Sequence, residues 1–307
     1  MTIRIGVVGT GPWARTTHAA GCAAHPDVEL TGIWGRDLGR ASALADPHGV
    51  PAYDDFDAFL EAVDAVTFAI TPDVQAELAI RAARAGKHLL LDKPVATTTE
   101  LADAVVDAAR DVSSVVFFTG RFVPDWEAWL AGFRPATTHS GSAAWLTLLA
   151  PDSPYAGSTW RKEQGALWDV GPHALSFLLP ALGPVVAVTG ARGRGDQVQL
   201  VLTHESGATS SMDLSLTMPV AARHQGVELW DATGRHTRPD TPRDVEAAYA
   251  QALTELVTCI REGRTTHRCD VRFGRDVVDV LARCEAALGG SGEDVGALGG
   301  QEQAADQ

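Results

Sequence analysis

One pair of residues suited to proton transfer stands inside an otherwise apolar segment. Asp169 and His173 are four residues apart in GALWDVGPHALSFL. On a helix this spacing places both side chains on one face, and imidazole, with a pKa of about 6.5, suits a proton acceptor near neutral pH. Pro172 fits the first turn of a helix better than its interior, so we expect the pair to straddle a helix start. The alternative is that Asp169 only caps and turns the chain around Gly171.

A lysine follows a run of strand-forming residues earlier in the chain. Asp92, Lys93 and Pro94 come directly after HLLL, at residues 88–91. Ligands of open α/β sheets bind beyond the carboxyl ends of the strands, and the proline restricts the backbone after the lysine. Lys93 is therefore a candidate site residue, although its position alone fits a surface lysine beside a strand exit equally well.

A glycine-rich turn near the N-terminus has the composition of a phosphate-binding loop. Residues 3–9 form a strand-like run, and an Ala-rich helical pattern follows from about residue 12. Gly9 suits a tight turn, Gly11 the close approach of a pyrophosphate, and Ala14 close helix packing. A helix start there also offers free N–H groups to phosphate. We predict that the dinucleotide contacts are Gly9, Thr10, Gly11, Pro12, Trp13 and Ala14.

The end of the next predicted strand carries the residues that distinguish NADP from NAD. An acidic residue there binds the ribose 2′-hydroxyl of NAD, whereas arginine accommodates the 2′-phosphate of NADP. Gly35 leaves room, Arg36 presents a planar fork, and Arg40 stands one helical turn later. Asp37 is the counter-argument, because it could bind the ribose or cap the next helix. We predict NADP, with NAD as the alternative.

The elements that must position these groups alternate between strand and helix in the first part of the chain. Strand-like runs and helical patterns follow one another at 3–9, 12–24, 28–35, 38–45, 65–70, 74–86, 88–92, 99–110 and 115–120. Strands separated by helices of about 10–15 residues indicate a parallel sheet with right-handed crossovers. This pattern predicts a doubly wound Rossmann domain over residues 1–120.

The pattern changes near residue 121. Strand-like runs then succeed one another across Gly, Pro and Asp turns, at about 142–150, 185–190, 197–203, 208–217 and 226–231. Such a succession indicates a mostly antiparallel sheet. Helical patterns at 165–182, 243–262 and 274–288 complete a predicted second α/β domain, over 121–288, with a large open sheet. The acidic, Gly-rich residues 289–307 are predicted to be a disordered tail.

The composition limits the classes of partner. With 39 acidic and 25 basic residues the formal net charge is −14, which disfavours nucleic acid and anionic membranes as partners. The four cysteines show no CxxC spacing, which disfavours a zinc site or a disulfide framework. No secretory signal or membrane-length apolar run is present. We expect a cytoplasmic protein that acts on a small molecule and holds no metal.

Several motifs, in order, resemble one family: the oxidoreductases related to glucose–fructose oxidoreductase and inositol dehydrogenase (the Gfo/Idh/MocA family). The resemblance covers nearly the whole chain before the tail and rests on GVVGTGPWA, TPDVQAELAIRAARAGKHLLLDKPVATT, GRFVP and WRKEQGALWDVGPH. The sequence departs from the family pattern at three positions. Asp92 stands where the family usually has Glu, Gln164 where it has the first of two glycines, and Gln75 where many members have histidine.

The resemblance implies an active site at the domain junction in which Lys93, Asp169 and His173 act together. Hydride transfer between an alcohol and a nicotinamide requires an acceptor for the hydroxyl proton. His173 suits that role, Lys93 would stabilise the developing alkoxide, and Asp169 would orient the imidazole or bind a neighbouring substrate hydroxyl. Additional cofactor contacts are then Thr71, Pro72, Asp92 and Lys93, and additional candidate substrate contacts are Trp160, Arg161 and Arg121.

Two of these arginines have a second interpretation. Arg161 could equally form a structural ion pair. Arg121, which follows the last Rossmann strand, is expected to brace the domain junction even though we keep it among the substrate candidates. The tryptophans are assigned to the core or to interfaces, namely Trp126, Trp129, Trp145 and Trp168.

The sequence thus predicts an NADP-dependent dehydrogenase or reductase that acts on a sugar, a polyol or a similar alcohol or ketone. Two alternatives stay open: net non-redox chemistry with a retained nicotinamide, and a dinucleotide-binding regulatory protein without turnover. A large open sheet with one uncovered face would expose apolar surface. Burial of that face against a second copy predicts a homodimer or homotetramer.

Overall fold

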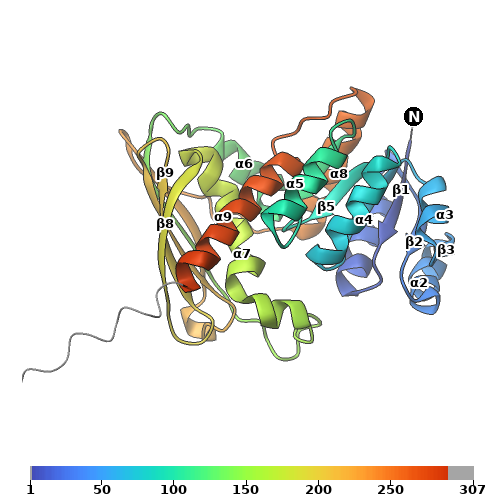
Figure 1. Ribbon diagram of the computed structural model, residues 1–307, viewed down its shortest axis with the longest axis horizontal. Helices are drawn as coiled ribbons and strands as arrows, with labels where there is room; N and C mark the ends of the chain where they lie inside the picture. Colours follow the sequence, from blue (N-terminus) through green and yellow to red (C-terminus); the bar gives the residue numbers. More distant parts are fainter. Residues whose placement is uncertain (1, 290–307) are drawn as a thin grey trace, which may run out of the picture.

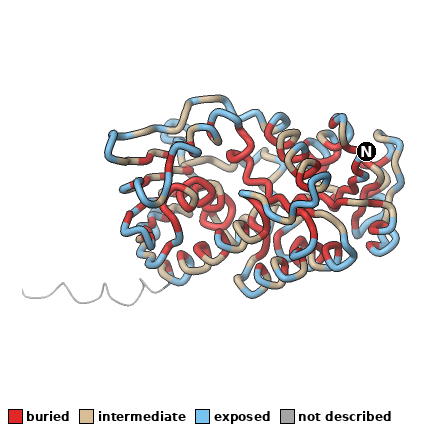
Figure 2. Tube along the Cα trace, turned by 90° about the horizontal axis from the view of Figure 1, so that it is seen from above, coloured by how far each residue is buried: buried red, intermediate tan, exposed pale blue. Residues whose placement is uncertain are grey.

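The protein has two lobes, each built on a six-stranded sheet (Figure 1). The structure is a computed structural model, and it describes residues 2–289. The first lobe contains the N-terminal sheet with helices on both faces, and α7 and α9 lie between it and the second sheet. Figure 2 shows buried chain running through the middle of both lobes, with exposed chain at the rim.

The first sheet is parallel, with the strand order β3-β2-β1-β4-β5-β6. Its central strand β4 is a short, mostly apolar run that is buried along its whole length, as expected where helices cover a parallel sheet on both sides. The order reverses between β1 and β4, which is the point where such sheets bind their ligands. The strands are β1 (Ile3–Val8), β2 (Val28–Trp34), β3 (Ala52–Tyr53), β4 (Ala65–Phe68), β5 (His88–Asp92) and β6 (Ser114–Phe117).

Short helices connect these strands, and several begin at a capping side chain. Asp37, Asp55 and Thr98 each accept a hydrogen bond from a backbone N–H of the following turn, which satisfies donors that a helix start leaves free. The elements are the π-helical turn η1 (Ala14–Ala19), α1 (Ala20–Ala24), α2 (Leu38–Ala45), η2 (Asp46–His48), α3 (Phe56–Glu61), α4 (Pro72–Arg84), α5 (Thr99–Ala108) and η3 (Thr119–Phe122). The predicted Rossmann architecture is confirmed.

The second sheet has the order β12-β11-β7-β10-β9-β8 and is antiparallel except between β7 and β10. Burial alternates along β9, because one face packs against α7 and α9 while the other is open. The prediction of a mostly antiparallel second sheet is confirmed. Its elements are α6 (Pro124–Leu130), β7 (Thr138–Leu146), α7 (Thr159–Leu182), β8 (Val185–Arg192), β9 (Val198–His204), β10 (Thr209–Ser215), η4 (Val220–Ala222), β11 (His224–Asp231) and β12 (Gly234–Thr237).

The last two helices join the lobes. α8 (Val245–Arg261) returns to the first lobe and packs against α1, β5 and β6, whereas α9 (Val271–Gly289) packs against α5, α7 and β8. The division of the chain after residue 120 stays a prediction, and the structure adds that α8 packs on the first sheet. Of the predicted tail, residues 289–307, Gly289 is instead the last residue of α9, and residues 290–307 lie outside the described residues. Across residues 2–289, none of the helices has the length and apolarity needed to cross a bilayer.

Candidate active site

A cavity of about 520 Å³ lies at the carboxyl edge of the first sheet. The turns that follow β1, β4 and β5 form one wall, and residues 154–161 together with α7 form the other. We call this the main cavity. The predicted site residues that line it are Gly11, Pro12, Trp13, Thr71, Pro72, Asp92, Lys93, Trp160, Arg161, Asp169 and His173. Residues from three of the four quoted motifs therefore meet at one place.

The turn after β1 has the geometry that a dinucleotide requires. Gly9 has a φ of +125°, and a Cβ there would lie 2.5 Å from the Ala69 carbonyl oxygen, so only glycine fits. A Cβ on Gly11 would meet no heavy atom within 4 Å, which leaves open space over the backbone where a pyrophosphate would approach. Ala14 is fully buried. The residues present therefore fit the bound nicotinamide dinucleotide that the sequence implies.

The residues predicted to select NADP lie away from the main cavity, at the start of α2. Arg36 and Arg40 are exposed, and Gly35 makes room for the turn after β1, since a Cβ there would lie 2.6 Å from Thr10 Cγ2. Asp37 is the helix cap: its carboxylate accepts the Arg40 N–H at 3.1 Å. Because this contact uses only the backbone of Arg40, the guanidinium groups of Arg36 and Arg40 stay available at the edge where an adenosine ribose would lie.

Gln75 holds the turn that presents Lys93, although the sequence marked it only as a departure from the family pattern. The Gln75 side chain is buried, donates to the carbonyl oxygens of Asp92 and Pro94 at 2.8 and 3.2 Å, and accepts the Asp92 N–H at 2.9 Å. The peptide bond between Lys93 and Pro94 is cis. Burial raises the pKa of the Asp92 carboxyl, against the opposing effect of Lys93. Gln75 thus fixes the backbone beneath the lysine.

Lys93, Asp169 and Arg161 form an ion cluster on the wall of the main cavity. Lys93 Nζ lies 3.1 Å from Asp169 Oδ1 and also donates to the Asp169 carbonyl oxygen. Arg161 Nε lies 2.9 Å from Asp169 Oδ2. Burial opposes ionisation of Asp169, but the two cations outweigh it and lower its pKa to about 2. Asp169 therefore stays a carboxylate whose oxygens are held by two cations, which disagrees with a purely local capping role.

His173 occupies the boundary between the main cavity and a smaller one of about 180 Å³. We call the latter the side cavity; its wall includes Trp145 and Gln225 of the second sheet. The imidazole stacks on the Trp145 ring, with centroids 5.9 Å apart and planes 16° apart. Burial, the Lys93 charge and the Arg243 charge lower the pKa of His173 well below its usual value. The imidazole is therefore neutral and free to accept a proton.

The local structure of α7 corrects one expectation about this pair. The helix is kinked at Gly165, where φ is +64° and ψ is −163°, a conformation that favours glycine. Asp169 and His173 both lie inside the helical segment after the kink, so the expected straddling of a helix start was wrong. Pro172 is tolerated in the interior because the tightly packed core around α7 overrides its low helix propensity. The kink also turns Arg161 back toward Asp169.

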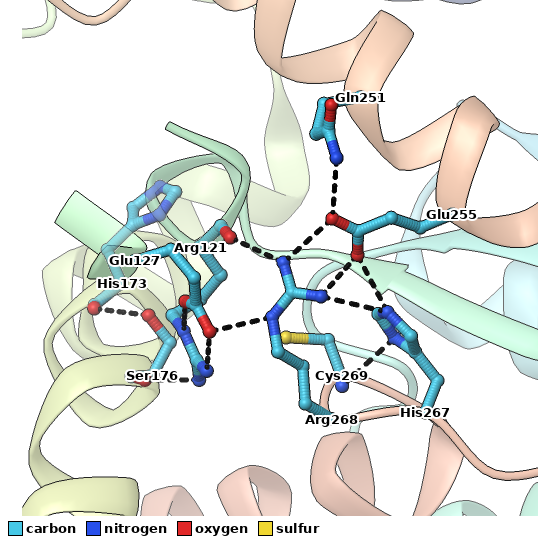
Figure 3. Close-up of polar contacts among 9 residues, drawn as sticks. All are labelled: Arg121, Glu127, His173, Ser176, Gln251, Glu255, His267, Arg268 and Cys269. Atoms are coloured by element: carbon cyan, nitrogen blue, oxygen red, sulfur yellow. Dashed lines mark hydrogen bonds and ion pairs between the residues drawn. The ribbon is translucent and has the colours of Figure 1, made fainter. Parts of the chain in front are cut away.

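Arg121 does not line either cavity, so its inclusion among the substrate contacts was wrong. The residue is 3% exposed, and its guanidinium pairs with both carboxylate oxygens of Glu127 at 2.7 and 3.1 Å and donates to the Ser176 carbonyl oxygen at 2.9 Å. Figure 3 shows this arginine within a larger network. We call that network the junction cluster; it consists of Arg121, Glu127, Glu255, His267 and Arg268.

The junction cluster joins η3, α6, α8 and the segment before α9. Arg268 pairs with Glu127 at 2.8 Å and with both oxygens of Glu255, which also accepts from His267 Nε2 at 2.7 Å (Figure 3). Ser176 links the cluster to the site, because its hydroxyl donates to the His173 carbonyl oxygen at 2.8 Å. The contacts of Arg121 are those of a brace between lobes, and the site helix rests on them.

Several cavity residues were not predicted from the sequence, and three of them matter for the chemistry of the site. Tyr155 and Arg243 line both cavities, and Trp145, which was assigned to the core, stacks on His173. Tyr155 lies in a turn-rich segment and Arg243 in TRPDTPRD, some 70 residues after His173. Neither has a spacing to a recognised motif, and only the return of α8 to the first lobe brings Arg243 to the site.

Comparison with known proteins relates the chain to one group. The family described as "Oxidoreductase family, NAD-binding Rossmann fold" (GFO_IDH_MocA) matches residues 3–119. Inositol 2-dehydrogenase from Rhizobium meliloti is 27% identical over 94% of this chain and 96% of its own length. D-xylose 1-dehydrogenase (NADP(+)) 2 from Haloferax volcanii is 28% identical over 62% of this chain and 63% of its own length. The chain spans 52% of the length of another curated relative, an oxidoreductase from Synechocystis.

The fold has close structural relatives. GenD2 from gentamicin A biosynthesis, solved in complex with NAD, superimposes with a TM-score of 0.80 at 23% identity over 94% of both chains. At this level of identity the likeness concerns the fold. It agrees with the two-sheet architecture and with the order of the two lobes described above.

Proposed function

We propose that the chain is an oxidoreductase of the Gfo/Idh/MocA family, whose model matches residues 3–119, and that it transfers hydride between a nicotinamide cofactor and a sugar, polyol or similar alcohol or ketone. One observation carries the proposal: Lys93, Asp169 and His173 meet at a cavity that the glycine-rich turn after β1 also lines. A relative of this chain is an inositol dehydrogenase and another a xylose dehydrogenase, which supports a hydroxyl-rich substrate.

The chain's own residues then have distinct tasks. A bound nicotinamide supplies the hydride acceptor or donor. A neutral ring nitrogen of His173 takes the hydroxyl proton as the C–H bond of the alcohol breaks. Lys93 Nζ donates a hydrogen bond to the same oxygen and stabilises alkoxide character. Asp169 holds Lys93 and Arg161 in place through its two carboxylate oxygens. This positioning role replaces the orientation of the imidazole that the sequence suggested.

We propose NADP as the preferred cofactor. Arg36 stands exposed just after β2 and Arg40 in the first turn of α2. Asp37, the acidic candidate for the ribose of NAD, has its Oδ1 engaged in capping α2. The xylose dehydrogenase relative is named for NADP(+). The neighbour GenD2 was solved with NAD, so the two cofactors need a direct test.

The test is titration of the purified protein with NADPH and, separately, with NADH, followed by nicotinamide fluorescence. We expect tighter binding of NADPH, and Arg36→Ala should weaken NADPH far more than NADH, because it removes a phosphate partner. Arg84→Ala, an exposed arginine at the end of α4, is the matched control. Equal losses for both cofactors would remove Arg36 from the phosphate site. Binding of neither would favour a structural role for Asp169 and His173.

We also propose that the open face of the second sheet pairs with a second copy. Val186 and Val201 are more than half exposed on that sheet, and exposed apolar surface of this kind marks interaction sites. Sedimentation velocity tests the proposal: a dimer or tetramer supports it, and a monomer at micromolar concentration contradicts it.

A further inference from the structure

The two cavities carry an imbalance of charge. Three cationic side chains line them, Lys93, Arg161 and Arg243, against two acids, Asp92 and Asp169. Asp169 is shared between Lys93 and Arg161. Arg243 is left without an acidic partner: none of its contacts with described residues is a hydrogen bond or an ion pair. Although Arg243 keeps access to solvent, burial lowers its pKa, so its charge is partly desolvated.

Arg161 also has unused donors. Its Nε binds Asp169, and its guanidinium lies 5.0 Å over the centroid of the Tyr155 ring. Its two terminal nitrogens have no hydrogen-bond acceptor among residues 2–289. Two arginines therefore present free planar forks toward space that both cavities share. Arginine forks match the geometry of carboxylates and phosphates, with two parallel N–H donors.

A third arginine makes the surroundings of His173 more positive. Arg238 lies 3.7 Å over the Trp126 ring and 5.6 Å from the Trp145 ring, and its buried Nε and Nη1 have no hydrogen-bond partner within the described chain. The charges of Arg238 and Arg243 both contribute to the lowered pKa of His173. Asp169 opposes these charges at the imidazole, and Asp240 lies close enough to Arg238 to offset its charge.

We propose that the substrate is a sugar acid, whose carboxylate is held by Arg243 and Arg161 while its carbinol faces Lys93 and His173. This inference rests on the proposed function and specifies its substrate class. The carboxylate belongs on the substrate side because Arg243 also lines the side cavity, together with Gln225 and Leu216 of the second lobe, away from the glycine-rich turn. One surplus positive charge matches a carboxylate, whereas a phosphate monoester carries nearly two negative charges.

The experiment compares matched acids and neutral sugars on the full-length protein saturated with NADP⁺. Calorimetric titrations would use D-gluconate against D-glucitol, D-galactonate against galactitol, and D-glucuronate against D-glucose, with D-glucose 6-phosphate as the phosphate arm. We expect at least one acid to bind ten times more tightly than its neutral partner. Arg243→Gln should weaken that acid about tenfold, the usual loss for a charged hydrogen bond, and leave the neutral partner unchanged.

Controls separate the possible outcomes. Arg84→Gln makes the same change of charge outside the cavities and should bind the acid as the wild type does. NADPH affinity should be the same in Arg243→Gln and wild type. If no acid outcompetes its neutral partner, or if Arg243→Gln leaves the preference intact, the inference is overturned. Tighter binding of D-glucose 6-phosphate than of every acid overturns the carboxylate assignment. Failure to bind NADPH at all instead overturns the proposed function itself.

Discussion

The junction cluster and the charged wall of the cavities use the same side chains in opposite ways. At the junction, Arg121 and Arg268 are met by Glu127 and Glu255, and each guanidinium makes two-pronged or shared contacts with a carboxylate. At the cavities, cations outnumber acids, and Arg243 has no acidic partner among the described residues. The first arrangement uses up its hydrogen-bonding capacity inside the protein, and the second keeps part of it open.

The difference indicates which charges the fold depends on. A buried pair is costly to break, because removal of one partner leaves the other charged and desolvated. A cation that faces a cavity without a partner already bears that cost, so its removal affects ligands more than folding. Substitutions at the two places should therefore separate stability from activity.

The largest effect is expected at Lys93. Lys93→Met should lower kcat about a thousandfold, within the range for loss of a positioned proton-transfer or oxyanion group. Its free energy of unfolding should fall less than that of a variant of the junction cluster, because the buried Asp169 carboxylate keeps its contact with Arg161. Steady-state kinetics and NADPH titration check this, with Lys87→Met, whose ammonium binds the Val63 carbonyl oxygen, as the control. A normal kcat in Lys93→Met would remove Lys93 from the active site.

The next largest effect is on stability, at Glu127. Glu127→Gln leaves Arg121, which is almost fully buried, without its carboxylate, and should lower the free energy of unfolding by about 3–4 kcal/mol. Urea unfolding of the variant, beside Glu77→Gln on the exposed face of α4, measures the loss. NADPH affinity should be retained under native conditions. A change below about 0.5 kcal/mol would mean that the junction cluster is not a stability element.

A pH-dependent effect of somewhat smaller size is expected from Glu255. Burial opposes its ionisation, but hydrogen bonds from His267, Arg268 and Gln251 lower its pKa to about 2 in the folded protein. Because the folded value lies below the unfolded value of about 4.3, the carboxylate stabilises the fold above that pH. The stabilisation, up to about 3 kcal/mol, is lost as the pH falls from about 4.3 toward 2. Glu255→Gln should flatten the dependence of the free energy of unfolding on pH in this range. An unchanged dependence would mean that other carboxyl groups cause the loss of stability in acid.

The smallest effect completes the comparison. Arg243→Gln should change the free energy of unfolding by less than about 0.5 kcal/mol, since no partner of this arginine in the described chain is lost. Urea unfolding in the absence of ligands measures it. A loss comparable to that of Glu127→Gln would show that Arg243 supports the fold and would weaken the contrast between the two regions.

Local patterns were sufficient to predict the first lobe and the main wall of the site. Gly9, Lys93 and His173 each follow a strand or lie on a helix whose periodicity is visible in the sequence, and the order of the motifs placed them together. The helix around Pro172 was harder, because packing against the second sheet outweighs the cost of an interior proline. Arg243 and Tyr155 could not be found from spacing, because tertiary contacts alone bring them to the site. The same is true of the partners of Arg121.

The return of α8 also has a consequence for synthesis of the chain. Tyr249 of α8 is fully buried, where its hydroxyl lies 2.9 Å from Thr67 Oγ1 and its ring faces Gly21. Residues 1–120 leave the ribosome well before this tyrosine, although N-terminal domains generally fold first during translation. The core of the first lobe therefore cannot be completed until more than half of the remaining chain has been synthesised. The ribosome delivers the second sheet before the first lobe is complete.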